Sequence, residues 1–157
     1  MRLIRYKPEY LEPMLALHRS AMHGFNTGIS QQVEESDLRA TEKEYLQNGG
    51  EFLIGLFNGA VIAMGGYQRL PGNIGELHRM RIRKDFQDQG YGSRLLQELE
   101  LRALHSGINK FIVQTAKARP LTLEFYRKHG YQETGSGFYG EVETLHFSKT
   151  IIEKPLK

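Results

Sequence analysis

In the first fifty positions, the spacing of apolar residues predicts one short strand followed by two helices. Residues 2–6 alternate between polar and apolar side chains, as a strand does. Residues 8–23 begin with a proline, which suits a first helical turn, and then repeat apolar side chains at helical spacing. Residues 24–32 are polar and contain glycine, which predicts a loop. Residues 36–48 predict a second helix, ended by two glycines.

The middle of the chain has the pattern of a hairpin followed by a further strand. Residues 51–57 and 60–68 are both strand-like, and the Asn58-Gly59 pair between them is the strongest short-range hairpin signal. Residues 74–82 predict the next strand.

Helices and strands alternate in the C-terminal half. Helices are expected over residues 93–106 and 120–129, and strands over residues 110–115, 131–134 and 142–147. The connection between residues 82 and 110 contains a helix, so it requires a parallel pair of strands. The chain is therefore expected to fold as one mixed α/β domain spanning residues 1–157.

Composition narrows the function classes. Hydrophobic residues make up 39% and charged residues 25%, a balance typical of a globular protein. A net charge of +3, with no dense basic stripe, does not predict a nucleic-acid partner. Cysteine is absent, which excludes disulfides, thiolate metal sites and a cysteine nucleophile. The histidines lack metal-ligand spacing, so no metal is expected. The N-terminus does not read as a secretory signal and no apolar run is long enough to span a membrane, so a cytoplasmic protein is expected.

A glycine-containing segment, Gln87-Asp88-Gln89-Gly90-Tyr91-Gly92-Ser93, follows a predicted strand and opens a predicted helix. Glycines there let the backbone turn tightly, and the free N–H groups at the start of the helix form an anion site. A dinucleotide-binding fingerprint would need a third glycine where Leu95 stands, and the Gly-Lys-Ser/Thr ending of a P-loop is absent. An ordinary tight turn is the alternative interpretation.

This segment, preceded by Glu-Leu-His-Arg-Met-Arg-Ile at residues 76–82 and followed by a leucine-rich helix, resembles the acetyl-coenzyme A signature of the GNAT N-acetyltransferase superfamily. Residues 125–131, Phe-Tyr-Arg-Lys-His-Gly-Tyr, are similar to the Tyr-x-x-x-Gly-Phe element of that family. The resemblance implies a GNAT-like mixed sheet with a splayed parallel strand pair, flanked by helices. It also implies transfer of acetyl from acetyl-CoA to a primary amine. The implied pyrophosphate ligands are backbone N–H groups, with Gln87 at the start of the loop: Gln89, Gly90, Gly92 and Ser93.

Two positions depart from the pattern of the family. Arg119 and Thr122 stand where many members have Asn and Ala, so the usual Asn contact to the pantetheine arm is missing. Arg119 is expected to meet the phosphates of the cofactor instead.

The apolar residues of the strand over residues 74–82 are Leu77, Met80 and Ile82. A regular strand would place Leu77 opposite the other two, whereas a one-residue bulge would bring all three to one face. A strand buried on both sides is the alternative. The resemblance implies the bulge, with the pantetheine arm pairing with the backbone of Met80 and Ile82. An N–H of Met80 or Arg81 would then face the thioester oxygen.

Amide formation from a thioester requires a neutral amine and a donor for the leaving thiolate. The resemblance places Tyr126 beside the sulfur as the acid, although a core tyrosine is the alternative. Glu76 matches the position of a catalytic glutamate in several members, and His78 shares its face of the strand. A surface histidine, a Glu76–arginine ion pair or a water chain as the base are the alternatives. Because cysteine is absent, direct attack in a ternary complex is expected.

The resemblance maps the acceptor site to residues 23–30 and 135–140, two glycine-rich segments with Phe25 and Tyr139 as the expected contacts. They are expected to form an adaptable lid, and two ordinary surface loops are the alternative. The acids over residues 34–37 could attract a cationic amine or could simply favour the start of a helix. A small-molecule amine is therefore the expected acceptor. A coenzyme-A-binding module without turnover, acting as a sensor, is the competing function, and a homodimer remains possible.

Overall fold

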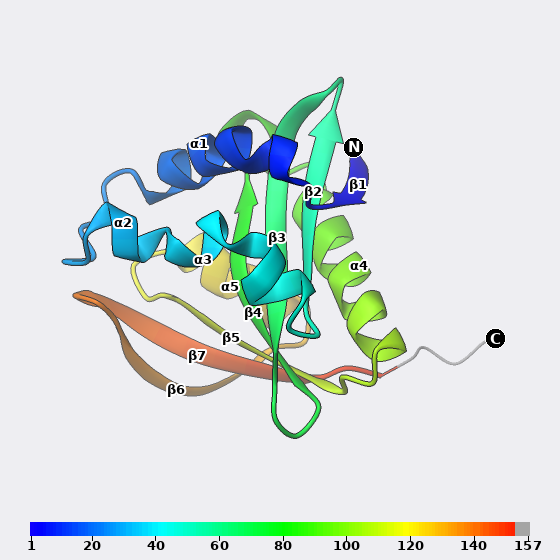
Figure 1. Cartoon of the computed structure of the whole chain (residues 1–157). Coiled ribbons are helices and arrows are strands. Elements are labelled where there is room, and N and C mark those ends of the chain that lie inside the picture. The colour runs from blue at the N-terminus through cyan, green and yellow to red at the C-terminus, as the bar shows by residue number, and fades with distance from the viewer. Residues whose placement is uncertain (153–157) are drawn as a thin grey trace.

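The computed structural model describes residues 1–152, which form one seven-stranded sheet with helices on both faces (Figure 1). The strand order is β1-β2-β3-β4-β5-β7-β6, and only the β4–β5 pair is parallel among the described pairs. The strands are β1 (Arg2–Arg5), β2 (Glu51–Phe57), β3 (Ala60–Leu70), β4 (Ile74–Ile82), β5 (Lys110–Ala116), β6 (Gln132–Tyr139) and β7 (Val142–Thr150). This is the mixed α/β sheet that the sequence predicts.

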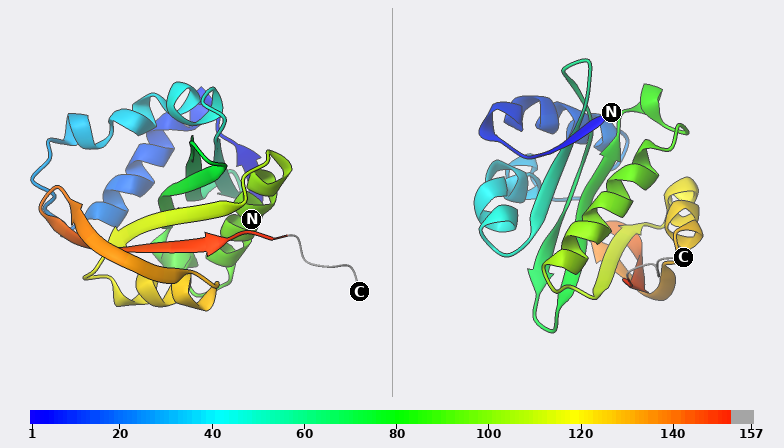
Figure 2. Two further views of the ribbon diagram at one scale, coloured as in Figure 1. Left: turned by 90° about the horizontal axis from the view of Figure 1, so that it is seen from below. Right: turned by 90° about the vertical axis from the view of Figure 1, so that its right-hand side faces the viewer.

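Two cores lie on opposite faces of the sheet. One face is covered by α1 (Leu11–Met22), which follows the 3-10 turn η1 (Pro8–Tyr10), and by α2 (Gln31–Glu34), α3 (Ser36–Arg39) and the π-helical turn η2 (Glu42–Leu46). The other face is covered by α4 (Tyr91–His105), which follows the 3-10 turn η3 (Lys84–Phe86), and by α5 (Pro120–Lys128). The right-hand view of Figure 2 shows α1 and α4 on the two sides of the sheet. No described helix is long and apolar enough to cross a membrane.

The hairpin, strand β4 and the loop before α4 follow the predicted pattern closely. β2 and β3 are joined through Asn58 and Gly59, both with positive φ (50° and 79°), as a tight hairpin turn requires. β4 has the predicted bounds. These elements carry local signals that do not depend on distant contacts, which is why their positions can be read from the sequence alone.

β4 contains the predicted bulge. Arg79 has a φ of +60°, and the β3–β4 register shifts between Met64 and Gly66, so two residues of β4 oppose one of β3. As a result, Leu77, Met80 and Ile82 all pack with the core on the α4 face. The parallel pairing with β5 ends at Leu77–Val113, and the two strands separate beyond it. The splayed pair is thereby confirmed.

Two predicted segments are different in the structure. The single helix over residues 36–48 is replaced by α3 and η2, because the hydroxyl of Thr41 donates to the carbonyl of Leu38. A further short helix, α2, begins within the predicted loop, where Ser30 accepts the N–H of Val33. Such local side-chain bonds compete with a continuous helix. The predicted lid at residues 135–140 is also wrong as a loop: it is mostly β6, paired with β7 as far as Tyr139–Val142.

Gly140, at the turn from β6 to β7, holds this hairpin against the loop after α1. Its φ is +57°, the N–H of Glu141 donates to the carbonyl of Thr27 at 2.6 Å, and a Cβ at Gly140 would collide with that same carbonyl. We predict that Gly140→Ala lowers the free energy of unfolding by about 1–3 kcal/mol, measured by urea denaturation.

Gly135→Ala is the matched control, because Gly135 lies on the same strand and a Cβ there would meet nothing within 4 Å. A change of under about 0.5 kcal/mol is expected for it. Equal stability of the two variants would contradict the role of Gly140 in joining the hairpin to the loop.

Candidate active site

A cavity of about 400 Å³ lies where β4 and β5 separate. Its lining includes Leu77 and Tyr126, which belong to the core on the α4 face, and Glu34 and Asp37 from the helices on the other face. The cavity therefore passes through the gap in the sheet. The walls are completed by the end of α1 and by β6 and β7.

Tyr126, on α5, lines this cavity and is 3% exposed. Its ring packs edge-on against Tyr131 and parallel to Phe147. Its hydroxyl has no hydrogen-bond partner within residues 1–152, while burial raises its pKa against the opposing effect of the nearby Arg81 guanidinium. The ring is thus a core tyrosine, as the alternative interpretation had it, and it keeps a protonated hydroxyl available at the cavity.

Glu76 and His78 meet in the cavity wall as the strand pattern predicts. Nε2 of His78 lies 2.7 Å from Oε1 of Glu76, and both side chains are about one-third exposed. This hydrogen bond lowers the pKa of Glu76. The expected alternative, an ion pair of Glu76 with an arginine, does not occur among the described residues. The two groups form a hydrogen-bonded pair whose unused atoms are open to a ligand.

The loop before α4 has the geometry of an anion site. Asp88 and Gly90 have positive φ (61° and 84°), and α4 begins directly after Gly90. A Cβ at Gly90 would meet nothing within 4 Å, so the space in front of the loop is open. Gly92 plays a different part, because its Cβ would lie 3.3 Å from the ring of Phe125. Its lack of a side chain lets α4 approach α5.

Other side chains of the loop are held by the protein itself. Gln87 and Gln89 donate to the carbonyls of Ile82 and Asp85, and the hydroxyl of Ser93 lies 2.8 Å from Nε2 of His129. Nδ1 of His129 lies 2.8 Å from the carbonyl of Phe125, so the ring takes the tautomer that donates there and accepts from Ser93. The side chains thus shape the loop, and its N–H groups are left for a ligand.

The structure brings Phe25, Tyr139, Arg81 and Arg119 together with this cavity. The guanidinium of Arg119 lies 4.1 Å from the centre of the Phe25 ring and donates to the carbonyl of Ala21. Arg119 is therefore tied to the end of α1, and these contacts differ from the cofactor-phosphate contact expected from the sequence. The hydroxyl of Tyr139 donates to Glu34 at 3.3 Å.

Arg79 organises the wall of the cavity on the α2–α3 side. Its guanidinium donates to Glu34 at 2.6 Å and to Asp37 at 2.7 Å, and Tyr45 donates to Asp37 at 2.6 Å. Burial alone would lower the pKa of Arg79, but these two carboxylates outweigh it and raise it. The sequence did not indicate this partnership, since Arg79 is more than forty residues from both acids.

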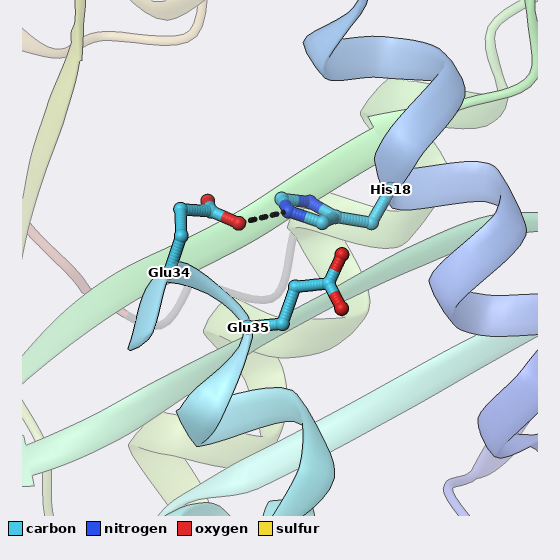
Figure 3. A group of neighbouring side chains, drawn as sticks. All are labelled: His18, Glu34 and Glu35. Atoms are coloured by element: carbon cyan, nitrogen blue, oxygen red, sulfur yellow. Dashed lines mark hydrogen bonds and ion pairs between the residues drawn. The ribbon is translucent and has the colours of Figure 1, made fainter. Parts of the chain in front are cut away.

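The acids at residues 34–37 are therefore not free to attract a cationic amine, which corrects that expectation. Glu35 is held by Arg19 through two hydrogen bonds of 2.8 and 2.9 Å, and Glu34 also binds Nε2 of His18 at 2.9 Å (Figure 3). Ligand atoms of His18, Glu34 and Glu35 lie within 4.8 Å of one another. Both carboxylates already have a guanidinium partner, Arg79 for Glu34 and Arg19 for Glu35.

The chain is similar in sequence and in fold to known acetyltransferases. The model of a family described as "Acetyltransferase (GNAT) family" matches residues 14–131. An IAA acetyltransferase of Azospirillum brasilense is 29% identical over 107 residues, 67% of each chain. An acetyltransferase of the GNAT family from Staphylococcus aureus Mu50 has the same fold, with a TM-score of 0.86, 20% identity, and coverage of 96% of this chain and 99% of that one.

A second solved structure with the same fold is an aminoglycoside 6'-N-acetyltransferase complexed with coenzyme A. It has a TM-score of 0.75 and 16% identity, and the match covers 99% of both chains.

The Glu34 carboxylate has a predictable effect on acid stability. Burial alone would raise its pKa, but hydrogen bonds and charges from His18 and Arg79 hold it at about 2, against 4.5 for an ordinary glutamate. Its contribution to folding is therefore complete above about pH 5 and is lost as the pH falls toward 2. We predict that Glu34→Gln destabilises the fold by up to about 3 kcal/mol at pH 7, and that the difference from wild type shrinks as the pH falls toward 2.

Urea titrations at pH 7, 5, 4 and 3 measure this difference. Glu124→Gln, which changes an exposed glutamate of α5, is the control and should match wild type throughout. A Glu34→Gln deficit that does not change with pH would show that shape rather than charge matters at this position.

Proposed function

The chain belongs to the acetyltransferase (GNAT) family, and we propose that it transfers acetyl from acetyl-coenzyme A directly to a primary amine of a small molecule. The observation that carries this proposal is the single cavity that passes through the gap between β4 and β5, with Tyr126 on one side and the Glu76–His78 pair on the other.

The loop before α4 supports pyrophosphate binding. The N–H groups of Gln89, Gly90, Gly92 and Ser93 lie at the start of a 15-residue helix, where the unpaired donors and the helix dipole both favour an anion. The open space in front of Gly90 leaves room for the phosphates.

The gap in the sheet supports binding of the pantetheine arm. Beyond Leu77, β4 has no partner strand on the β5 side. An extended ligand could therefore pair with the backbone of Met80 and Ile82, in place of the Arg81 and Gln87 side chains that now donate to their carbonyls. An N–H of Met80 or Arg81 would then polarise the thioester carbonyl. With the pantetheine arm in this gap, the acyl group would extend from the α4 face into the cavity.

The reaction makes one bond and breaks one. The nitrogen of the neutral amine attacks the thioester carbon, the C–S bond breaks, Tyr126 donates to the leaving thiolate, and the proton of the amine passes to the base. Because the hydrogen bond from His78 lowers the pKa of Glu76, the carboxylate alone is a weak base. We therefore assign proton acceptance to His78, with Glu76 orienting its ring through Nε2. A water held by the pair is the alternative route for this proton.

A coenzyme-A-binding sensor without turnover is the competing function. It would need the loop and the gap, but it would have no use for a protonated tyrosine hydroxyl without an internal partner or for an open Glu76–His78 pair. Thiol release from acetyl-CoA in the presence of amines separates the two functions.

Charge at the loop before α4 tests the donor site. We predict that Gln89→Glu weakens acetyl-CoA binding about 10-fold at low ionic strength, because a carboxylate next to the pyrophosphate repels it. Higher salt should reduce the effect. Gln97→Glu makes the same change in charge on an exposed position two turns further along α4, and should leave the affinity within about twofold. Calorimetry at two salt concentrations measures both, and equal affinities of the two variants would place the phosphates elsewhere.

Removing the hydroxyl of Tyr126 tests its proposed role as the acid that protonates the leaving thiolate. With the amine panel as acceptors, we predict that Tyr126→Phe lowers kcat by about 10²-fold while the KM for acetyl-CoA changes little, because the ring and its packing remain. Thiol release, with mass spectrometry of the acetylated amine, provides the rate and the product. Wild-type turnover by this variant would refute the role of the hydroxyl, and thiol release with no amine in the panel would favour the sensor.

A further inference from the structure

Two arginines in the wall of the cavity have no carboxylate partner. Among the described residues, neither Arg81 of β4 nor Arg119 at the start of α5 takes part in an ion pair, although both line the cavity. The acids that line it are already engaged, since Glu34 and Asp37 bind Arg79 and Glu76 binds His78. The cavity lining has as many arginines as carboxylates, but the carboxylates all bind Arg79 or His78, and none binds Arg81 or Arg119.

Both guanidinium groups reach the last turn of α1. Arg119 donates to the carbonyl of Ala21, and Nη2 of Arg81 lies 3.5 Å from the sulfur of Met22, the next residue. Nη1 of Arg81 donates to the carbonyl of Met80 at 3.1 Å, while its buried Nε has no partner. The two cations therefore lie at one end of the cavity, and they retain unused donors there.

Nothing in the described chain neutralises this end. Burial lowers the pKa of Arg81 to about 10, with the positive charges of Arg79 and Arg119 adding to the effect, and burial also lowers the pKa of Arg119. The end of α1 contributes roughly half an elementary negative charge, and the face of Phe25 contributes a weaker attraction to Arg119. Two full cations remain under-compensated, and a buried charge without a partner is unfavourable unless a ligand supplies one.

We infer that the acceptor is an amine that also carries a carboxylate, of the amino-acid class, and that Arg81 and Arg119 bind this carboxylate. The inference rests on the proposed acetyl transfer and names the class of its acceptor. Guanidinium groups match a carboxylate because their donors can bind both of its oxygens. The Glu76–His78 pair lies in the same cavity and can receive the proton of the amine, so the two charged groups of a zwitterion each have a counterpart.

A carboxylate could also reach this end of the cavity on the acyl group of the donor, as in succinyl-CoA. We favour the acceptor because Arg119 is stacked on Phe25, in the loop that borders the α1–α3 side of the cavity, away from the loop before α4. The experiment below includes a separate measurement for a carboxylate carried by the acyl donor.

The first experiment compares matched acceptors with acetyl-CoA as donor. Each amino acid is paired with its methyl ester and its amide, which keep the amine and remove the negative charge. We expect kcat/KM to be about 10- to 100-fold higher for the free acids, the range for a charge-assisted hydrogen-bonded pair. Acetylation of the esters and amides as fast as the acids would overturn the inference and leave the acetyltransferase function in place. If an amine without a carboxylate is acylated faster with succinyl-CoA than with acetyl-CoA, the arginines bind a carboxylate of the donor, and the inference about the acceptor is overturned.

The second experiment removes the charges. Arg81→Met and Arg119→Met should each raise the KM for the carboxylate-bearing acceptor about 10- to 100-fold and lower the ratio of kcat/KM for the acid to that for its matched ester, while the KM for acetyl-CoA changes little. Because the Arg81 guanidinium also lies near Tyr126, any change in kcat for that variant should be the same with the acid and the ester. Arg83→Met, which changes the neighbouring arginine paired with Asp85, is the control and should leave all three parameters unchanged.

The melting temperatures of the variants distinguish a role of the two arginines in binding from a role in supporting the fold. Because Arg81 is a half-buried cation without an ion pair and its buried Nε has no partner, Arg81→Met should raise Tm by a few degrees in the absence of acceptor. A fall in Tm with equal loss of activity toward acids and esters in both variants would show that the arginines support the fold, and would overturn the inference.

Discussion

The backbone at Arg79 adopts a left-handed conformation in the middle of a strand, and the guanidinium of the same residue binds two carboxylates from the opposite wall of the cavity. These two facts are coupled. The bulge ends the pairing of β4 with β5 and turns Leu77, Met80 and Ile82 to the α4 face. It also directs Arg79 to the other face, where Glu34 and Asp37 offset the energy of burying it. The gap in the sheet and the wall that faces it therefore depend on one residue.

This ion-pair cluster also explains how such short helices persist. α2 and α3 have four residues each, too few to be stable through their own hydrogen bonds. Glu34, Glu35 and Asp37 attach them to Arg79 of the sheet and to Arg19 of α1. A buried ion pair adds little net stability compared with a well-packed apolar contact, but losing one partner typically costs about 3–5 kcal/mol. The cluster thus determines where the wall lies more than how stable the whole protein is.

Much of the fold could be predicted from the sequence, because its signals are local. The Asn58-Gly59 turn, the apolar pattern of β4 and the glycines before α4 each determine a conformation within a few residues. The shared face of Glu76 and His78 followed from the strand pattern, whereas the place of Tyr126 at the site was implied by the resemblance to the GNAT superfamily. The partners of the acids could not be predicted, because Glu34 and Asp37 bind Arg79, more than forty positions away. The division of residues 31–46 into three helical pieces was also missed, because it depends on side-chain bonds of Ser30 and Thr41 that the spacing of apolar residues does not show. The free end of the cavity at Arg81 and Arg119 is recognisable only once those partners are known.

The cavity that passes through the sheet has a consequence for kinetics. The loop before α4, which we propose binds the donor, lies on one face, while the proposed acceptor side is bordered by α1–α3 and by β6 and β7 on the other. In the proposed reaction the donor then approaches from the α4 face and the acceptor from the α1–α3 face. Such an arrangement imposes no compulsory order of addition, so initial-rate patterns should be those of random sequential binding, and each product can depart by the side from which its parent substrate came.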